Sequence, residues 1–201
     1  MWEFIDKVIY INLDEATERK ARIEKELLVI PSDKIIRLSA IKGSNFIGCV
    51  KSHIKAIEMA ISNKWNNVLI LEDDMIWKNY EQGYMLLEQL VKSPYDVISL
   101  GNTYVQYDKD IYKLIGGQAA TAYIVNKHYM EVLKDNFMDG LELLVQTGEG
   151  QKYAIDVYWK LLQKKDNWRL VHPAMSVQNP GYSYIEKKTV NYLHLFNGYE
   201  K

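Results

Sequence analysis

The stretch VLILEDDMIW (residues 68–77) runs four apolar residues directly into three carboxylates, Glu72, Asp73 and Asp74, and then turns apolar again. The apolar run is typical of a buried strand. Three adjacent negative charges repel one another, and a buried charge is costly unless it is paired or bound to a metal. The acidic triplet at the end of this strand therefore requires a positive partner.

The segments around this stretch alternate between strand-like and helix-like patterns. Over the first hundred residues they are predicted in turn at 7–13 (strand), 15–28 (helix), 34–40 (strand), 49–61 (helix), 67–71 (strand), 81–91 (helix) and 96–101 (strand). Alternation of this kind predicts an α/β fold, a Rossmann-like, mainly parallel sheet with helices on both faces. Ligands bind at the carboxyl ends of the strands in such sheets, which is where the triplet lies.

The pattern becomes less regular beyond residue 101. The predicted elements there are a loop with a short hairpin (102–114), a turn and strand (116–126), helices (127–137 and 153–165) and a strand broken at Pro173 (168–178). Little regular structure is expected after Pro180. The length of 201 residues predicts a single domain, residues 1–201.

The composition is that of an ordinary globular protein, with 48% hydrophobic and 25% charged residues. A net charge of -1 gives no indication of nucleic-acid binding. The single cysteine, Cys49, excludes an intrachain disulfide and a cysteine-rich zinc site. No segment reaches the roughly 20 apolar residues of a transmembrane helix, and the N-terminus does not read as a signal peptide. These features predict a cytoplasmic protein.

The triplet itself suits a divalent cation. If the chain stays extended, Glu72 and Asp74 point one way and Asp73 points the other. The converging pair is a Glu-x-Asp version of the Asp-x-Asp arrangement, and Mg²⁺ or Mn²⁺ bound there would bridge the carboxylates to a diphosphate. The cation would relieve the repulsion and neutralise a leaving phosphate. The alternative is a solvated acidic turn.

Five sequence blocks occur together in a characteristic order: VIYINLDEATERKARIEKEL (8–27), GCVKSHIKAIEMAI (48–61), VLILEDDM (68–75), GGQAATAYIVNKHYMEVL (116–133) and YAIDVYW (153–159). In these blocks the chain resembles glycosyltransferase family 25, the group of lipopolysaccharide-biosynthesis and collagen β-galactosyltransferase domains. The resemblance implies a GT-A-type fold, a UDP-sugar donor, inversion at the anomeric carbon and a divalent metal, with Mn²⁺ expected first and Mg²⁺ second. It also implies a nucleotide-binding half at about residues 1–100 and an acceptor half at about 101–201.

The resemblance implies a set of donor-binding residues: Asn12, Leu13, Arg19, Gly48, Ser52, His53, Glu72 and Asp73. Arg19 could reach a phosphate because a guanidinium suits oxyanions, but a solvated helix residue is an equal alternative. Gly48 opens a predicted helix, and a glycine at a helix N-terminus favours a bound anion. His53 is included on the resemblance alone.

The same resemblance implies the metal ligands and the catalytic base. The metal would be held by Glu72 and Asp74, with His172 as the third ligand and His194 as its competitor. Asp156 is the predicted general base, because an inverting transfer needs a carboxylate to deprotonate the acceptor hydroxyl. The alternative for Asp156 is a first-turn acid favoured by the helix dipole.

These expectations combine into one leading function: a metal-dependent, inverting transferase that moves a hexose from a UDP-sugar to a hydroxyl of a glycan or protein. Galactose is the first choice of sugar and glucose the second. A domain of the same fold that binds nucleotide sugar or glycan without turnover is the main alternative. A receiver-type phosphotransfer domain ranks lower, because its acidic pair would follow an earlier strand than the third.

Overall fold

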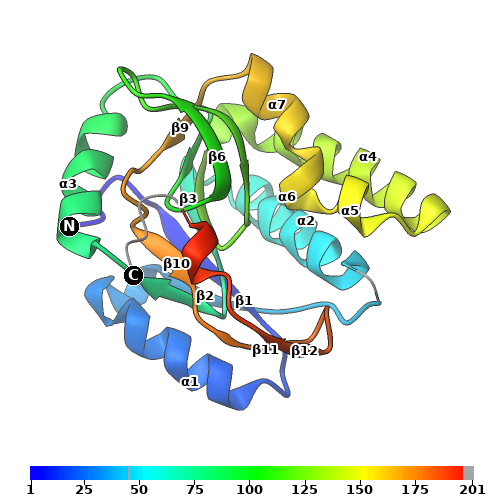
Figure 1. Ribbon diagram of the computed structural model, residues 1–201. Helices are drawn as coiled ribbons and strands as arrows, with labels where there is room; N and C mark the ends of the chain where they lie inside the picture. Colours follow the sequence, from blue (N-terminus) through cyan, green and yellow to red (C-terminus); the bar gives the residue numbers. More distant parts are fainter. Residues whose placement is uncertain (45, 197–201) are drawn as a thin grey trace.

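The computed structural model describes residues 1–44 and 46–196 of the chain. An eight-stranded sheet in the order β2-β1-β3-β8-β5-β9-β7-β6 forms its centre (Figure 1). Its strands are β1 (Lys7–Asn12), β2 (Ile35–Ser39), β3 (Asn67–Glu72), β5 (Val97–Ser99), β6 (Thr103–Asp108), β7 (Lys113–Gln118), β8 (Ala122–Asn126) and β9 (Trp168–Leu170). The predicted α/β fold is confirmed.

Most strands of the central sheet run in the same direction. β1 is parallel to both β2 and β3, and β5 is parallel to β9. β8 lies between β3 and β5 and is antiparallel to both. β7 is antiparallel to β9 and to β6. The sheet is therefore mostly parallel in strand direction, with β8 and β7 reversed.

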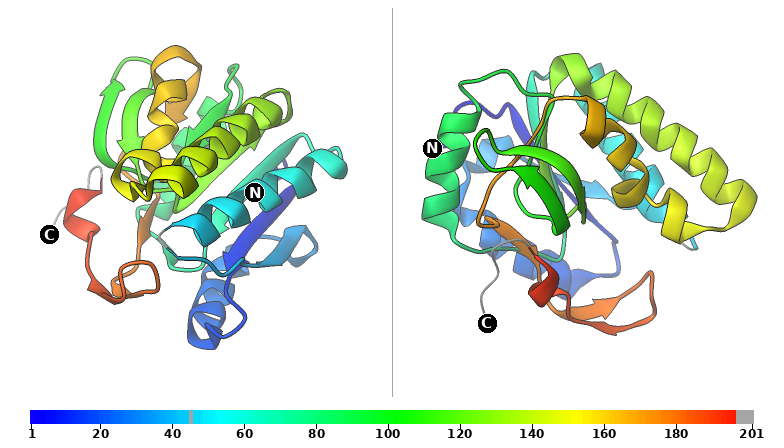
Figure 2. Two further views of the ribbon diagram at one scale, coloured as in Figure 1. Left: turned by 90° about the vertical axis from the view of Figure 1, so that its right-hand side faces the viewer. Right: turned by 45° about the horizontal axis from the view of Figure 1, so that its top comes forward.

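Helices cover both faces of this sheet, and the side chains of β3 alternate between the two cores, as its period of two requires. Val68 and Ile70 pack with α2 (Ile47–Ser62) and α4 (Met130–Thr147) on one face. Leu69 and Leu71 pack with α1 (Thr17–Glu26) and α3 (Tyr80–Leu90) on the other. The right-hand view of Figure 2 shows α1 and α3 on one side of the sheet and α2 and α4 on the other. Both cores are predominantly apolar, so the acidic triplet is the polar end of an otherwise buried strand.

The structure differs from three predictions in the second half of the chain. The helix expected over 127–137 continues to Thr147, and the residue after it, Gly148, has a φ of 72°, the left-handed conformation common after helices. The expected hairpin is present as β6–β7, but it extends the main sheet and continues to Gln118, so the strand expected over 116–126 is shortened to β8. The segment after Pro180 is regular: β11 (Gly181–Ser183) pairs with β12 (Lys188–Val190), and a turn of 3₁₀ helix, η4 (Leu193–Leu195), follows.

The helix predicted over 153–165 is instead three short helices, α5 (Gly150–Tyr153), α6 (Ile155–Tyr158) and α7 (Lys160–Lys165). Ala154 adopts an extended conformation between the first two. Tertiary contacts explain the break, since the Trp159 indole is buried and donates to the Gly117 carbonyl at 3.0 Å. The contacts that this segment makes with β7 stabilise the fold more than the backbone hydrogen bonds of an uninterrupted helix would.

A second, two-stranded sheet brings the C-terminal part of the chain to the triplet. β4 (Met75–Trp77) pairs antiparallel with β10 (Ser176–Gln178), and Met75 faces Gln178 in the register. The strand predicted over 168–178 is therefore divided between two sheets, β9 in the large one and β10 in the small one. This division places Gln178 next to Asp74.

We expect Gly101→Ala to destabilise the protein by about 1–3 kcal/mol, because an added Cβ would overlap the carbonyl oxygen of Ser176 in β10. The free energy of unfolding from urea titrations measures the effect. Gly116→Ala is the matched control, since its Cβ would lie 3.6 Å from the nearest atom, in Gln106. Equal stabilities of the two variants would contradict tight packing between the segment that follows β5 and β10.

Candidate functional site

The acidic triplet lies at the carboxyl end of β3, beside the N-terminus of α2. β3 ends at Glu72, and Asp73 and Asp74 form the turn into β4. All three carboxylates line one cavity of about 230 Å³. The cavity wall also includes most of the residues that the sequence predicted for a donor: Leu13, Arg19, Gly48, Ser52 and His53. The structure therefore brings residues from β3, α1 and α2 to one site.

Asp73 and Asp74 turn toward the same partner, Arg19 of α1. The guanidinium forms ion pairs with Asp73 Oδ1 and, at 2.7 Å, with Asp74 Oδ2. The predicted division, with Glu72 and Asp74 on one side and Asp73 on the other, is wrong. It assumed an extended chain, whereas the strand stops at Glu72 and the turn rotates both aspartates toward α1.

Asn12 forms a hydrogen bond with Asp73, one of the two acids that pair with Arg19. Its side chain is buried and donates from Nδ2 to Asp73 Oδ2 at 2.7 Å, while its Oδ1 accepts from Arg37 Nε at 3.0 Å. Arg19 also lies 5.8 Å from the ring centroid of Tyr184, which follows β11. Asn12 thus orients an acid of the cavity and is not itself among the residues that line it.

Asp74 carries an unsatisfied oxygen. Its side chain is only 14% exposed, and Oδ1 has no hydrogen-bond partner among the described residues. Burial raises its pKa to about 6, against the opposing effect of Arg19, and the charges of Glu72 and Asp73 raise it further. Burial also raises the pKa of Asp73. A buried acceptor without a partner fits a site for a cation, and oxygen ligands of this kind suit Mg²⁺ or Mn²⁺.

Glu72 has different partners on the α2 side. Its Oε1 lies 3.6 Å from Cys49 Sγ and 3.4 Å from His53 Nε2. Burial raises the pKa of Glu72, but the hydrogen bond and the charge of His53 oppose it, and the net direction is down. His53 is buried, and its Nδ1 lies 2.9 Å from Tyr123 Oη. Cys49 and Tyr123 were missed by the sequence reasoning, although Cys49 and His53 stand one helical turn apart.

Gly48 and Ser52 shape the wall of the cavity. A Cβ on Gly48 would overlap the backbone of Ile41 and Gly43, so glycine lets the loop before α2 lie against the helix. The Ser52 hydroxyl donates to the Gly48 carbonyl at 2.7 Å and accepts from the Ile41 amide at 2.8 Å. Both residues therefore fix the loop that forms one side of the site.

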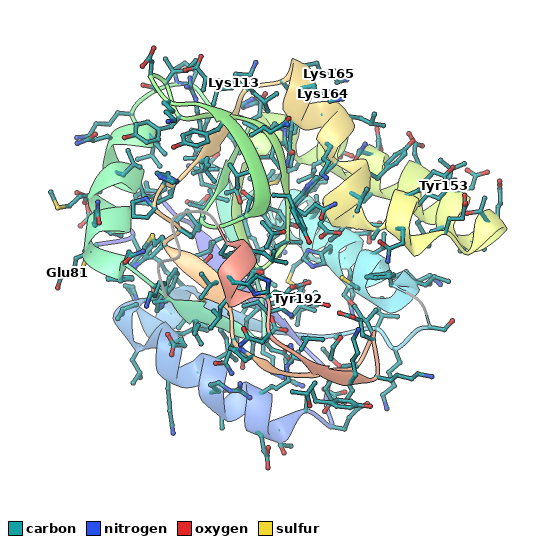
Figure 3. The ribbon with its side chains drawn as sticks, viewed as in Figure 1. Glu81, Lys113, Tyr153, Lys164, Lys165 and Tyr192 are labelled. Atoms are coloured by element: carbon teal, nitrogen blue, oxygen red, sulfur yellow. The ribbon has the colours of Figure 1, made fainter. Side chains whose placement is uncertain are left out.

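A second cavity of about 280 Å³ adjoins the first, and Glu72 and Cys49 line both. Asp156, in the first turn of α6, lines it and accepts a hydrogen bond at Oδ2 from the Ala119 amide at 3.0 Å. Burial raises the pKa of Asp156, and the charge of Glu72 raises it further, against the opposing hydrogen bond from Ala119. Phe46, Tyr104 and Tyr192 add aromatic surface, and Figure 3 labels Tyr192 beside η4.

Neither predicted histidine ligand lines these cavities. The His172 ring lies 5.1 Å from the Tyr107 ring of β6, and burial lowers its pKa. His194 is exposed in η4. Among the described side chains, Gln178 reaches the triplet from the C-terminal part: its Nε2 donates to Asp74 Oδ2 at 3.1 Å, and the Asn179 amide donates to the Asp74 carbonyl at 2.7 Å. The strand pattern did not identify it, because pairing of β10 with β4 depends on the tertiary fold.

Comparisons with solved structures concern the fold. A glycosyltransferase involved in the glycosylation of the major capsid of PBCV-1 is 9% identical, with 86% of this chain and 92% of that chain covered and a TM-score of 0.52. Mannose-1-phosphate geranyltransferase from Thermus thermophilus is 10% identical (82% and 72% covered, TM-score 0.48). The glycosyltransferase GlyE of Streptococcus pneumoniae is 13% identical (84% and 45% covered, TM-score 0.49). The first of these similarities assigns a GT-A-like fold.

Comparisons at the level of sequence bear on the middle of the chain. A search among curated proteins found no significant match. Among the described residues, no helix combines the length and apolar character needed to cross a membrane. A family model matches residues 42–139, which contain three of the five sequence blocks, the acidic triplet, Gly48, Ser52 and His53. Residues 42–139 therefore match glycosyltransferase family 25 (LPS biosynthesis protein), the family that the sequence blocks predicted.

Proposed function

We propose that the protein is a metal-dependent, inverting glycosyltransferase that transfers a hexose from a UDP-sugar to a hydroxyl of a glycan or protein. Galactose is the first choice of sugar and glucose the second. The observation that carries the proposal is the pair of adjoining cavities: one holds three carboxylates with an unsatisfied oxygen on Asp74, and the other holds the partly buried Asp156. The family match supports the reaction class.

In this proposal the donor occupies the cavity of the acidic triplet. Asp74, Asp73 and Glu72 would hold a divalent cation, Mn²⁺ or Mg²⁺, which supplies positive charge for the diphosphate that leaves. Arg19 now neutralises Asp73 and Asp74, so a bound cation would free its guanidinium for a phosphate oxygen. Leu13, Gly48, Ser52 and His53 line the remaining wall.

Asp156 is the proposed general base. Its carboxylate takes the proton from the acceptor hydroxyl, whose oxygen then bonds to the anomeric carbon as the bond to the UDP oxygen breaks. The hydrogen bond from the Ala119 amide to Oδ2 fixes the carboxylate, which leaves Oδ1 for the hydroxyl. Attack from the face opposite UDP inverts the anomeric carbon.

In this proposal the acceptor occupies the second cavity, the one that Asp156 lines, and the lining of this cavity favours a neutral sugar. Its described lining has three acids, Glu72, Asp156 and Glu186, and no lysine, arginine or histidine. Tyr104, Tyr192 and Phe46 also line it, and aromatic rings suit the apolar face of a sugar. An acceptor with a phosphate or carboxylate beside its reacting hydroxyl would meet like charge there.

A donor screen tests the proposal. UDP-, GDP- and CMP-sugars are incubated with Mn²⁺ and a panel of neutral sugars, and nucleotide release and thermal shift are measured. We expect release from UDP-hexoses, dependent on added metal. A preference for GDP- or CMP-sugars would contradict the proposed donor. Binding of UDP with neither transfer nor hydrolysis of UDP-sugars would instead support a nucleotide-sugar-binding module of the same fold.

The pH dependence of turnover tests the role of Asp156. Because the pKa of this carboxyl is raised above its ordinary value of 3.8, the base becomes protonated at a higher pH than an exposed aspartate. We expect kcat to fall with decreasing pH along an acid limb that lies above pH 3.8. The rates are measured at saturating metal and donor, after a pre-incubation control for stability at each pH. An acid limb at or below the ordinary aspartate value would contradict the assignment.

A further inference from the structure

A sulfur, a nitrogen and a carboxylate oxygen meet in the wall of the cavity that the acidic triplet lines. Cys49 Sγ, one ring nitrogen of His53 and one carboxylate oxygen of Glu72 all lie within 4.8 Å of one another. The Glu72 oxygen is 3.6 Å from the sulfur and 3.4 Å from the imidazole nitrogen. The oxygen-rich site proposed for the donor cation makes no use of Cys49 or His53 as ligands.

The spacing of these atoms matches the edges of a zinc tetrahedron. Zinc binds sulfur at about 2.3 Å and nitrogen or oxygen at about 2.0–2.2 Å, so neighbouring ligand atoms lie roughly 3.3–3.8 Å apart. Both distances to the Glu72 oxygen fall in this range. Small side-chain adjustments would therefore suffice to close the three ligands around an ion.

The fold holds the three side chains from two rigid elements. Cys49 and His53 occupy positions i and i+4 of α2, one above the other on the same face. Glu72 is the last residue of β3. The other ring nitrogen of His53 lies 2.9 Å from Tyr123 Oη, and Phe137 packs edge-on against the ring. A hydrogen bond on the far nitrogen is the usual support of a metal-binding histidine.

We propose that Cys49, His53 and Glu72 form a binding site for a borderline divalent ion of the zinc class, with its fourth position open to the cavity. A thiolate–imidazole–carboxylate set favours Zn²⁺ or Co²⁺ over Mn²⁺, which prefers oxygen ligands. Binding releases the thiol proton of Cys49 to solvent. The ion uses Glu72, so it competes with the donor cation for this carboxylate.

The site stands on its own ligands and does not depend on transfer activity, so its test is spectroscopic. Co²⁺ is titrated into the untagged, metal-free chain of 201 residues. We expect one equivalent to produce the visible bands of tetrahedral cobalt and a near-ultraviolet thiolate-to-cobalt charge-transfer band. Addition of Zn²⁺ should bleach both. Because Cys49 is the single cysteine of the chain, the charge-transfer band has one source. Absence of that band at stoichiometric Co²⁺ would overturn the proposal.

Variants separate this site from the proposed donor-cation site. Cys49→Ser should remove the charge-transfer band, and Tyr123→Phe should weaken Co²⁺ binding by about 10–100-fold. Asp74→Asn is the matched control and should keep the band, since Asp74 is not in the cluster. An unchanged Co²⁺ affinity in Cys49→Ser would contradict the ligand assignment. If the variants do not fold, the reaction of Cys49 with a thiol reagent is measured in the wild type with and without Zn²⁺. Slower reaction with Zn²⁺ would support the site, and an unchanged rate would reject it.

Discussion

Asp156→Asn is expected to lower kcat by about 10²–10⁴-fold, the usual contribution of a general base, while the Kd of UDP stays close to wild type. Asparagine has nearly the same shape and retains an oxygen that can accept from the Ala119 amide, so the short helix α6 should stay in place. The lost function is the uptake of the acceptor proton. Steady-state rates at saturating donor and acceptor measure kcat, and isothermal titration with UDP measures binding.

Asp139→Asn provides the control for this variant, because Asp139 is exposed on α4 and is absent from the lining of both cavities. Its kcat should equal that of wild type. If Asp156→Asn keeps more than a tenth of wild-type turnover, Asp156 is not the base. Glu72 would then be the next candidate, since it is another carboxylate that lines the same cavity.

The first half of the fold could be predicted from the sequence because its pattern is local. β1, β2, α2 and β3 follow from runs of apolar residues with strand or helix period, and the structure places each within a few residues of its prediction. The second half could not, because its form depends on contacts between distant segments. The broken helix around Ala154 and the pairing of β10 with β4 are examples.

The candidate site shows the same division. The placement of the triplet at a strand end was predictable, since parallel strands present their carboxyl ends to ligands. The partners of the triplet were not. For Arg19 the sequence left two alternatives, a phosphate contact or a solvated position. In the structure it instead pairs from α1 with Asp73 and Asp74 in the turn after β3. Gln178 comes from a strand more than a hundred residues away in sequence. Strand alternation cannot describe side chains beyond the residue at which a strand ends.

Asp74→Asn is expected to abolish metal-dependent transfer, because it removes one of the carboxylates proposed to hold the donor cation and the diphosphate. A loss of about 10³-fold or more in kcat/KM corresponds to some 4 kcal/mol of transition-state stabilisation. The Kd of Mn²⁺, from titration in the presence of UDP, should rise in parallel. Asp110→Asn, an exposed acid in the β6–β7 turn, is the control and should change neither quantity. Wild-type rates in Asp74→Asn would show that Asp74 does not hold the donor cation.

The same substitution should stabilise the metal-free protein at neutral pH, which separates lost function from lost fold. The pKa of Asp74 is about 6 in the folded protein and 3.8 as its ordinary value, so the folded state binds more protons between these values. Stability of the wild type therefore falls as pH rises from about 4 to about 6 and stays lower above that. Asparagine carries no charge and avoids this loss. Above pH 6 in EDTA, we expect the free energy of unfolding of Asp74→Asn to exceed that of the wild type by about 1–3 kcal/mol. The difference should vanish near pH 4, and a destabilised variant at neutral pH would show that the Arg19 ion pair outweighs the cost of the buried charge.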